Sequence, residues 1–246
     1  QGSAFEGEAL LALLGIYERS RDWARARVIA ERLETAEQGS FAPRLAHYLC
    51  EQAEIAQRTD DAAGALTLLN EAVQRAPQLA RGWMALSALR AQTGDASGAF
   101  DALVQLNRHA PQYLPLAAQQ FAVLARQSGR EAEAVALLQA SHDRAASVDV
   151  TEALASLSPD PQAARVRYLN HLEREPSLVI TSQWLAGETL SDASAQASVK
   201  RALDQASGPL KRYRCAACGF EARQHFWQCP GCQAWDSYPA RRVEEL

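Results

Sequence analysis

A 34-residue repeat is the feature that most restricts the folds open to this chain of 246 residues. The stretch 46–77, AHYLCEQAEIAQRTDDAAGALTLLNEAVQRAP, and the stretch 80–111, ARGWMALSALRAQTGDASGAFDALVQLNRHAP, start 34 residues apart. Both end on a proline, Pro77 and Pro111, which prevents a preceding helix from continuing. Repeats of this size bury their apolar faces only against their neighbours, so the period predicts a stack of helical hairpins.

The two stretches also share the residues that such hairpins need at fixed places. Where two helices cross closely the second must carry a small residue, and Ala65 and Ala99 occupy that place. The later stretch resembles the tetratricopeptide repeat through Trp83, Leu86, Gly94, Asp95, Ala99 and Pro111. The earlier stretch resembles it through Ala53, Ala65, Ala72 and Pro77. The resemblance implies a mostly α fold, a right-handed helical solenoid of the tetratricopeptide type.

Looser repeats extend the pattern in both directions. A unit marked by Trp23 precedes the two clear ones, and a later turn at Gly129 comes about one residue late. A second helix stopped by Pro176 and a degenerate last pair complete the array. We expect about five hairpins and almost no strand before residue 210. Two domains follow, a tetratricopeptide-repeat solenoid over 1–207 and a metal-binding domain over 208–246.

Four of the five cysteines form two C-x2-C motifs near the C-terminus, separated by ten residues. Four thiolates at this spacing converge on one tetrahedral metal ion. Two disulfides are less favoured because nothing in the sequence indicates secretion, and a redox pair lacks its strand-helix context. We expect Gly219 and Gly231 to provide the unusual backbone angles and the amide donors of tight knuckles. The predicted metal ligands are Cys215, Cys218, Cys229 and Cys232.

The identity of the metal follows less directly from the spacing. The motifs resemble rubredoxin-type knuckles, which hold iron in electron carriers and zinc in structural ribbons. Because the two motifs are much closer together than in the electron carriers, we predict one Zn²⁺ in a small rubredoxin-like zinc ribbon, with Fe as the alternative. The alternative function is then that of a rubredoxin-like iron electron-transfer protein. Four sulfur ligands leave no open position for water or substrate, which excludes hydrolytic metal catalysis.

Aromatic residues gather around the cysteines and allow more than one interpretation. They form the core of a small module, a protein-binding face, or a stacking surface for bases as in a zinc-ribbon nucleic-acid-binding module. The chain has a net charge of −4, and from Gly208 onward six basic residues face four acidic ones, so we expect no nucleic acid partner. The aromatic set is Tyr213, Phe220, Phe226, Trp227, Trp235 and Tyr238.

The sequence lacks a recognisable catalytic constellation. None of the histidines pairs with an acidic residue at metal-ligand spacing or lies beside a nucleophile, and no Gly-rich phosphate loop is present. We interpret Cys50 as a small buried residue of a first helix and His225 as a residue packed among aromatics rather than a ligand. These observations predict that the chain is not an enzyme. The five histidines are His47, His109, His142, His171 and His225.

The motifs YRCxxCGF and WxCPxCxAW in the tail, with IYERSRDWARA near the start, resemble the lipopolysaccharide assembly protein B family. The resemblance covers essentially the whole chain and matches the cytoplasmic portion of that family. It implies a non-enzymatic adaptor that promotes proteolysis of the lipid A deacetylase LpxC by the membrane AAA+ protease FtsH, and so regulates lipopolysaccharide biosynthesis. It also implies a lipopolysaccharide-sensing inner-membrane regulator as a partner, and it assigns metal ligation to the four cysteines of the tail.

The same resemblance implies a location at the cytoplasmic face of the bacterial inner membrane. The family is held there by a single N-terminal anchor followed by further repeats, which this sequence does not contain. No run of about 18 apolar residues occurs, and no signal peptide opens the chain, so we expect this portion to be soluble.

In tetratricopeptide arrays the first helix of each unit lines a concave groove, which is the expected partner-binding surface. A mixed polar groove suits a protein segment better than a lipid tail, although charged helix residues are usually only solvated. The frame of the repeats nominates His47, Glu54, Gln57, Arg58, Arg81, Met84, Gln92, Gln119 and Arg126 as partner-binding residues.

Overall fold

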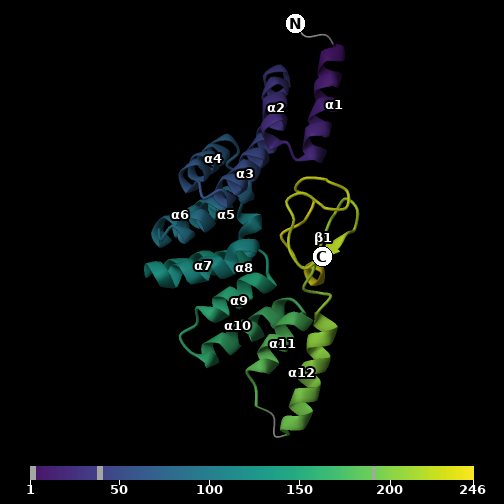
Figure 1. The fold of residues 1–246 in the computed structure, drawn as a ribbon. Coiled ribbons are helices and arrows are strands. Elements are labelled where there is room, and N and C mark those ends of the chain that lie inside the picture. Colours follow the sequence, from purple (N-terminus) through teal and green to yellow (C-terminus); the bar gives the residue numbers. More distant parts are fainter. Residues whose placement is uncertain (1–3, 38–40, 190–191) are drawn as a thin grey trace. The chain divides into compact units, whose positions relative to one another are not determined.

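The computed structural model describes residues 4–37, 41–189 and 192–246 (Figure 1). The chain forms two compact units, Gln1–Ala110 and Pro111–Leu246. The cysteine module therefore belongs to the same compact unit as the helices that follow Pro111. The predicted domain boundary between residues 207 and 208 separates the repeats from the cysteine module, and it stays a prediction.

Three helical hairpins make up the described part of the first unit. Helix α1 pairs with α2, α3 with α4 and α5 with α6, while α2 also packs on α3 and α4 on α5 (Figure 1). Each hairpin thus contacts its neighbours along the chain, as the 34-residue repeat predicts. The helices are α1 Ala4–Ser20, α2 Trp23–Glu37, α3 Ala42–Arg58, α4 Ala62–Arg75, α5 Ala80–Gln92 and α6 Ala96–His109.

The two clearest repeats begin their second helices with the same local structure. Asp61 Oδ1 accepts a hydrogen bond of 2.8 Å from the amide of Gly64, and Asp95 Oδ1 accepts one of 2.8 Å from Gly98. Each aspartate caps orphan amides of the first turn. A Cβ atom at Gly64 would lie 2.1 Å from the Asp61 carboxylate, and one at Gly98 would lie 2.0 Å from that of Asp95. The cap therefore requires glycine three residues after each aspartate.

The turn between the helices of a hairpin contains a left-handed residue at a regular interval. The φ angles are +63° at Asp60, +86° at Gly94 and +68° at Gly129. The first two positions are 34 residues apart and the next is 35 residues further on. The predicted shift of the later repeat by one residue is therefore confirmed.

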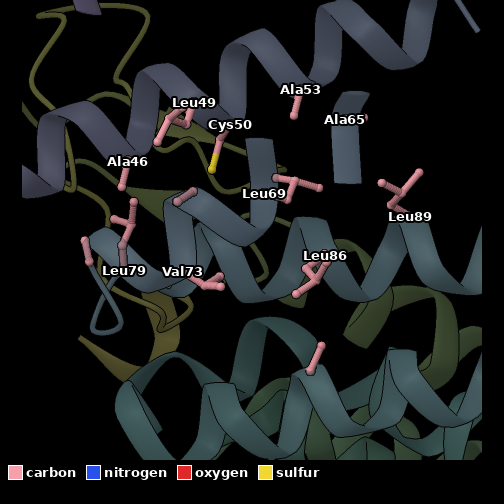
Figure 2. Packing of buried hydrophobic residues seen from close by; sticks show 13 residues of the cluster. Ala46, Leu49, Cys50, Ala53, Ala65, Leu69, Val73, Leu79, Leu86 and Leu89 are labelled. Carbon is pink, nitrogen blue, oxygen red and sulfur yellow. The ribbon is translucent and has the colours of Figure 1, made fainter. Parts of the chain in front are cut away.

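The core of the first unit lies between successive hairpins. In Figure 2 Cys50 of α3 points toward Leu69 of α4, and both side chains are fully buried. Burial raises the pKa of the Cys50 thiol to about 12, so this thiol stays protonated at neutral pH. The prediction that Cys50 is a buried packing residue is confirmed. The buried cluster also includes Ala46, Leu49, Ala53, Ala65, Ala72, Val73, Leu79, Leu86 and Leu89.

The second unit contains three more hairpins followed by the cysteine module. Helix α7 pairs with α8, α9 with α10 and α11 with α12, and α12 leads into the module (Figure 1). Helices α9 and α11 have only 9 residues each. The elements are η1 Pro111–Tyr113, α7 Leu114–Ser128, α8 Glu131–Arg144, α9 Val148–Ser156, α10 Pro161–Arg174, α11 Leu178–Ala186, α12 Ala193–Ser207, β1 Tyr213–Arg214, β2 Glu221–Ala222 and η2 Val243–Glu245.

Strand structure is confined to the module within the described residues. Strands β1 and β2 are antiparallel, with Tyr213 opposite Ala222, and an isolated bridge joins Gln228 to Trp235. The predicted fold class, a helical repeat protein of the tetratricopeptide type ending in a small four-cysteine module, is confirmed. The described chain contains six hairpins where about five were expected. Among the described helices, none combines the length and the apolar character that crossing a bilayer requires.

Two buried histidines meet in the core of the second unit. Thr151 Oγ1 lies 2.8 Å from His171 Nδ1 and 3.4 Å from His142 Nδ1. The same hydroxyl donates its proton to the carbonyl of Ser147 at 2.8 Å, so it accepts hydrogen bonds from the ring nitrogens. Burial, followed by the charges of His142 and Arg174, lowers the pKa of His171 to about 4. Both rings are therefore held neutral in the folded unit at neutral pH.

We predict that acid destabilises the second unit through His171. The unfolded chain, in which histidine has a pKa of about 6.5, binds more protons than the folded chain between pH 6.5 and 4. The free energy of unfolding should therefore fall by about 3 kcal/mol as the pH drops through this range. Urea unfolding at several pH values measures it. His171→Asn, which keeps a donor at the ring position, should flatten the curve, and the exposed His109→Asn should not. The same dependence of the unfolding free energy on pH in the unmodified chain and in both variants would contradict the prediction.

Candidate metal centre

The four cysteine sulfurs of the module converge on one point. Cys215 Sγ lies 3.8 Å from Cys232 Sγ, Cys218 Sγ lies 3.7 Å from Cys229 Sγ, and all four atoms lie within 4.8 Å of one another. A tetrahedral ion with metal–sulfur bonds of about 2.3 Å has sulfur–sulfur edges of about 3.8 Å, whereas a disulfide requires about 2.05 Å. The four sulfurs therefore have the spacing that a tetrahedral metal ion requires.

Two equivalent knuckles position these sulfurs. In the first, the amide of Gly219 donates to the carbonyl of Cys215 at 2.8 Å, and in the second the amide of Gln233 donates to the carbonyl of Cys229 at 2.8 Å. The backbone of Gly231 donates to Cys229 Sγ at 3.4 Å. Amide donors directed at sulfur stabilise the thiolate, as the knuckle motif predicts.

One backbone prediction for the knuckles is wrong. Gly219 has a φ of +77°, as expected, but in the second knuckle the left-handed residue is Gln233, with a φ of +61°, and not Gly231. Gln233 is the residue after the second cysteine of its motif, and Gly219 holds the same place in the first. A Cβ atom at Gly231 would lie 3.6 Å from Phe220, at an ordinary contact distance. Gly231 thus contributes its amide rather than its conformational freedom.

The sulfurs differ in how readily they ionise. Burial alone would raise the pKa of Cys215, but its hydrogen-bonding contacts with Ser237 and with nearby backbone amides lower it to about 6. The amide of Phe220 favours the Cys218 thiolate, yet burial and the three other sulfurs raise its pKa to about 12. Four thiols this close cannot all lose their protons unless a cation lies between the sulfur atoms. A divalent ion supplies that charge and would hold all four as thiolates.

Three of the six aromatic residues of the module, Tyr213, Phe226 and Tyr238, form its core, as one of the sequence interpretations proposed, whereas Phe220 is exposed. Tyr213 and Tyr238 are buried beside Cys215 and Cys229, and Phe226 packs against them. His225 lies among these rings, 4.6 Å from the Trp227 centroid and 5.7 Å from that of Tyr213. Its Nε2 lies 3.0 Å from the carbonyl of Tyr238. The prediction that His225 is packed among aromatics is confirmed.

A buried ion pair fastens the end of the chain to helix α9. The guanidinium of Arg242 lies 2.9 Å and 2.7 Å from the two carboxylate oxygens of Asp149, which is 6% exposed. A third nitrogen donates to the carbonyl of Lys211 at 2.7 Å, and the guanidinium carbon lies 4.2 Å from the centre of the Tyr213 ring. A two-point pair whose remaining donors are also bonded is the arrangement that offsets the cost of burying both charges.

Two glutamates next to Arg242 cap helices of the second unit. The Glu244 carboxylate accepts hydrogen bonds from Ser177 Oγ at 2.8 Å and from the amide of Val179 at 3.3 Å, at the start of α11. Glu245 Oε1 accepts one of 2.8 Å from the amide of Val148, the first residue of α9. Carboxylates at helix N-termini satisfy orphan amides and interact favourably with the helix dipole. We name Arg242, Glu244 and Glu245 together the C-terminal clasp.

The module packs on several hairpins of its unit rather than on the last one alone. Tyr113, just before α7, packs on Trp227 with ring centres 5.8 Å apart, and Leu116 of α7 packs on the module core. The clasp adds contacts at the starts of α9 and α11. The module therefore braces the first helices of all three hairpins in its unit.

Sequence reasoning identified the cysteines but missed the clasp. Arg242 and Asp149 are 93 residues apart, and nothing in the local pattern around either indicates the other. Paired glutamates in a C-terminal tail are usually only solvated charges. One signal in the sequence could have indicated the clasp. Two acidic residues lie near the C-terminus, and the short helices α9 and α11 of the same unit require N-terminal caps.

The predicted partner-binding residues differ in exposure. His47 and Arg81, in the first unit, are buried, and Arg81 Nη2 lies 2.8 Å from Glu51 and 2.7 Å from Glu54. Arg81 thus joins α5 to α3, and neither of the two buried side chains offers free contact surface. Glu54, Gln57 and Met84 are half-buried, and Arg58, Gln92, Gln119 and Arg126 are exposed. Their role in binding a partner stays a prediction.

The fold and the site together define a class of protein. Helical hairpins of the tetratricopeptide type present surface for other molecules, and the cysteine cluster has the knuckles of a rubredoxin-like metal-binding module. A family model described as a rubredoxin metal binding domain, the Zn ribbon of LapB, matches residues 213–238.

Curated relatives are similar to nearly the whole chain. Lipopolysaccharide assembly protein B of Escherichia coli (strain K12) is 27% identical over 97% of this chain, and that of Haemophilus influenzae is 23% identical over 95%. The resemblance to this family inferred from the sequence is confirmed. The chain spans 64% of the length of the E. coli protein and 61% of that of H. influenzae.

One solved structure with a TM-score above 0.5 supports the fold alone. BtubC from P. vanneervenii matches with a TM-score of 0.53 at 16% identity, over 76% of this chain and 90% of that protein. A tetratricopeptide repeat protein from Parabacteroides merdae gives a TM-score of 0.47 at 13% identity, over 82% of this chain and 78% of that one.

We predict that Arg242→Ala destabilises the second unit by about 3 kcal/mol, because it leaves the buried Asp149 carboxylate without its partner. Arg241→Ala, at an exposed neighbouring position, should cost less than about 0.5 kcal/mol. Urea unfolding of both variants at a fixed metal concentration measures the difference. A similar small loss in both variants would show that the clasp contributes little to stability.

Proposed function

We propose that this chain is the partner-binding portion of a non-enzymatic adaptor that acts in lipopolysaccharide assembly. The observation that carries the proposal is the similarity to proteins named lipopolysaccharide assembly protein B, which extends over 97% of the chain. The similarity includes both the hairpins and the cysteine module, so the comparison does not rest on the common repeat alone.

The proposed mechanism is presentation of one protein to another. The adaptor brings the lipid A deacetylase LpxC to the membrane protease FtsH, and thereby limits lipopolysaccharide output, while a lipopolysaccharide-sensing inner-membrane regulator acts on the adaptor. The location is the cytoplasmic face of the inner membrane, through an N-terminal anchor outside this sequence. Stacked hairpins support this mechanism, because they offer extended surfaces of mixed polarity that suit protein segments.

For the metal we propose one Zn²⁺, bound by Cys215, Cys218, Cys229 and Cys232. The sulfur–sulfur distances of 3.7 and 3.8 Å fit a closed tetrahedral site, and such sites supply folding energy rather than chemistry. Iron fits the same tetrahedron, and an iron-filled site would indicate electron transfer instead. The closed coordination also supports a non-enzymatic role.

The decisive experiment combines metal analysis with capture of the two partners. Cys229→Ser with Cys232→Ser should abolish binding of one zinc per chain, loosen the module and reduce capture of both FtsH and LpxC by at least about tenfold, because metal binding and folding of the module are coupled. Cys50→Ala removes a thiol outside the site and should retain zinc and capture.

Two outcomes would count against the proposal. Undiminished capture by the double cysteine variant would separate the module from partner binding. Iron with visible charge-transfer absorption and a reversible redox couple in the purified chain would favour the electron-transfer function.

A further inference from the structure

A strongly basic hollow lies in the second unit, between the end of α12 and the cysteine module. Its volume is about 440 Å³, and four of its six lining residues are cationic while none is acidic. This concentration of positive charge occurs in a chain whose net charge is −4. The lining residues are Gly208, Pro209, Lys211, Arg212, Arg223 and Arg242.

The walls of the hollow are fixed by backbone hydrogen bonds between segments distant in sequence. The amide of Val243 donates to the carbonyl of Arg212 at 2.7 Å, and the amide of Glu244 donates to that of Leu210 at 3.3 Å. The turn after α12 and the C-terminal tail therefore hold each other in place. A site built from such segments is formed before a ligand arrives, which reduces the entropy lost on binding.

The cations of the hollow differ in how far they are already neutralised. Arg242 is held by Asp149 and by the Tyr213 ring, so its guanidinium has one fixed position. Arg212 lies 3.7 Å from Glu221. Lys211 and Arg223, in contrast, form no ion pair with any described residue.

The surrounding charges leave an excess of positive charge. Glu221 is shared, since it also lies 2.8 Å from Arg214. Glu152 is half-buried, and its pKa is raised chiefly by burial and by Asp149, while the charges of Lys211 and Arg242 act in the opposite direction. The five cations Lys211, Arg212, Arg214, Arg223 and Arg242 thus outnumber the nearby carboxylates, which are Asp149, Glu152, Glu221 and Glu245. The remaining positive charge favours a bound anion.

We propose that this hollow binds a phosphate group. Guanidinium groups bind phosphate oxygens in pairs of parallel hydrogen bonds, and lysine adds a point charge, so a phosphate is the anion that this set of side chains suits best. The volume exceeds that of one phosphate, so the group belongs to a phosphorylated organic molecule, either soluble or the headgroup of a lipid. This inference does not depend on the adaptor function.

Two other classes of anionic partner fit the hollow less well. Single-stranded nucleic acid needs exposed aromatic rings on which bases stack. Tyr213, the ring beside Arg242, is only 5% exposed and already carries the guanidinium on its face. Acidic peptides carry carboxylates, each with a single negative charge. Such a peptide needs several acidic residues to match the negative charge of one phosphate.

The test uses the whole chain and a matched pair of double variants. Lys211→Gln with Arg223→Gln removes the two unpaired cations and leaves the clasp intact. Lys200→Gln with Arg201→Gln removes the same charge from the exposed surface of α12. Calorimetric titration with glycerol 3-phosphate and flotation with phosphatidylcholine vesicles, with and without phosphatidylglycerol, provide the two probes. Polyglutamate and a single-stranded oligonucleotide serve as competing anions.

We expect glycerol 3-phosphate to bind one to one, and the Lys211/Arg223 variant to bind at least about tenfold more weakly while the control variant binds normally. Flotation with phosphatidylglycerol vesicles that is lost in the same variant would assign the phosphate to a lipid headgroup. Binding of the soluble probe without flotation would assign it to a soluble molecule. No binding of either probe, equal loss in both variants, or tighter binding of polyglutamate or oligonucleotide would overturn the proposal.

Discussion

The ion pair between Arg242 and Asp149 is the interaction on which the arrangement of the second unit most depends. It connects the last residues of the chain to the first turn of α9, across 93 positions of sequence. A buried pair is not stabilising merely because the charges are opposite, since removing both from water costs several kcal/mol. Here every face of the guanidinium is used, by two carboxylate oxygens, by the carbonyl of Lys211 and by the ring of Tyr213. The pair therefore fixes both the tail and the β1 residue beneath it.

The metal site and the clasp support the module from opposite sides. Apart from four cysteines, the module has a few aromatic rings as its core, and a domain of this size does not bury enough apolar surface to fold reliably by itself. Ligation of one ion would join the two knuckles, and the clasp joins the module to α9 and α11. The metal site acts on the two knuckles, whereas the clasp acts on the C-terminal tail. Loss of the metal site therefore leaves the tail attached to the helices, and loss of the clasp leaves the knuckles joined. The hairpins in turn gain caps for α9 and α11, whose 9 residues make them too short to be stable alone.

Local and periodic features could be predicted from the sequence, and long-range pairings could not. The caps at Asp61 and Asp95 and the late turn at Gly129 follow from residues that repeat at a fixed spacing, because each depends on neighbours within one turn of helix. The convergence of the four cysteines follows equally from spacing. The burial of Arg81 was missed because the repeat frame places this residue on the expected groove face. The frame does not reveal that two glutamates form ion pairs with it in the folded unit. The clasp was missed for the same reason, since only the folded chain brings its members to α9 and α11.

Arg242 belongs both to the clasp and to the wall of the basic hollow, so it couples the stability of the clasp to occupation of the hollow. Asp149 neutralises one edge of its guanidinium, and the repulsion of Lys211, Arg212 and Arg223 acts on the same region. An anion in the hollow relieves that repulsion without competing for Asp149. A ligand that binds only the folded unit also raises its stability in proportion to the logarithm of ligand concentration. Occupation of the hollow would therefore hold the cysteine module more firmly against α9 and α11, although the ligand touches neither the metal site nor these helices.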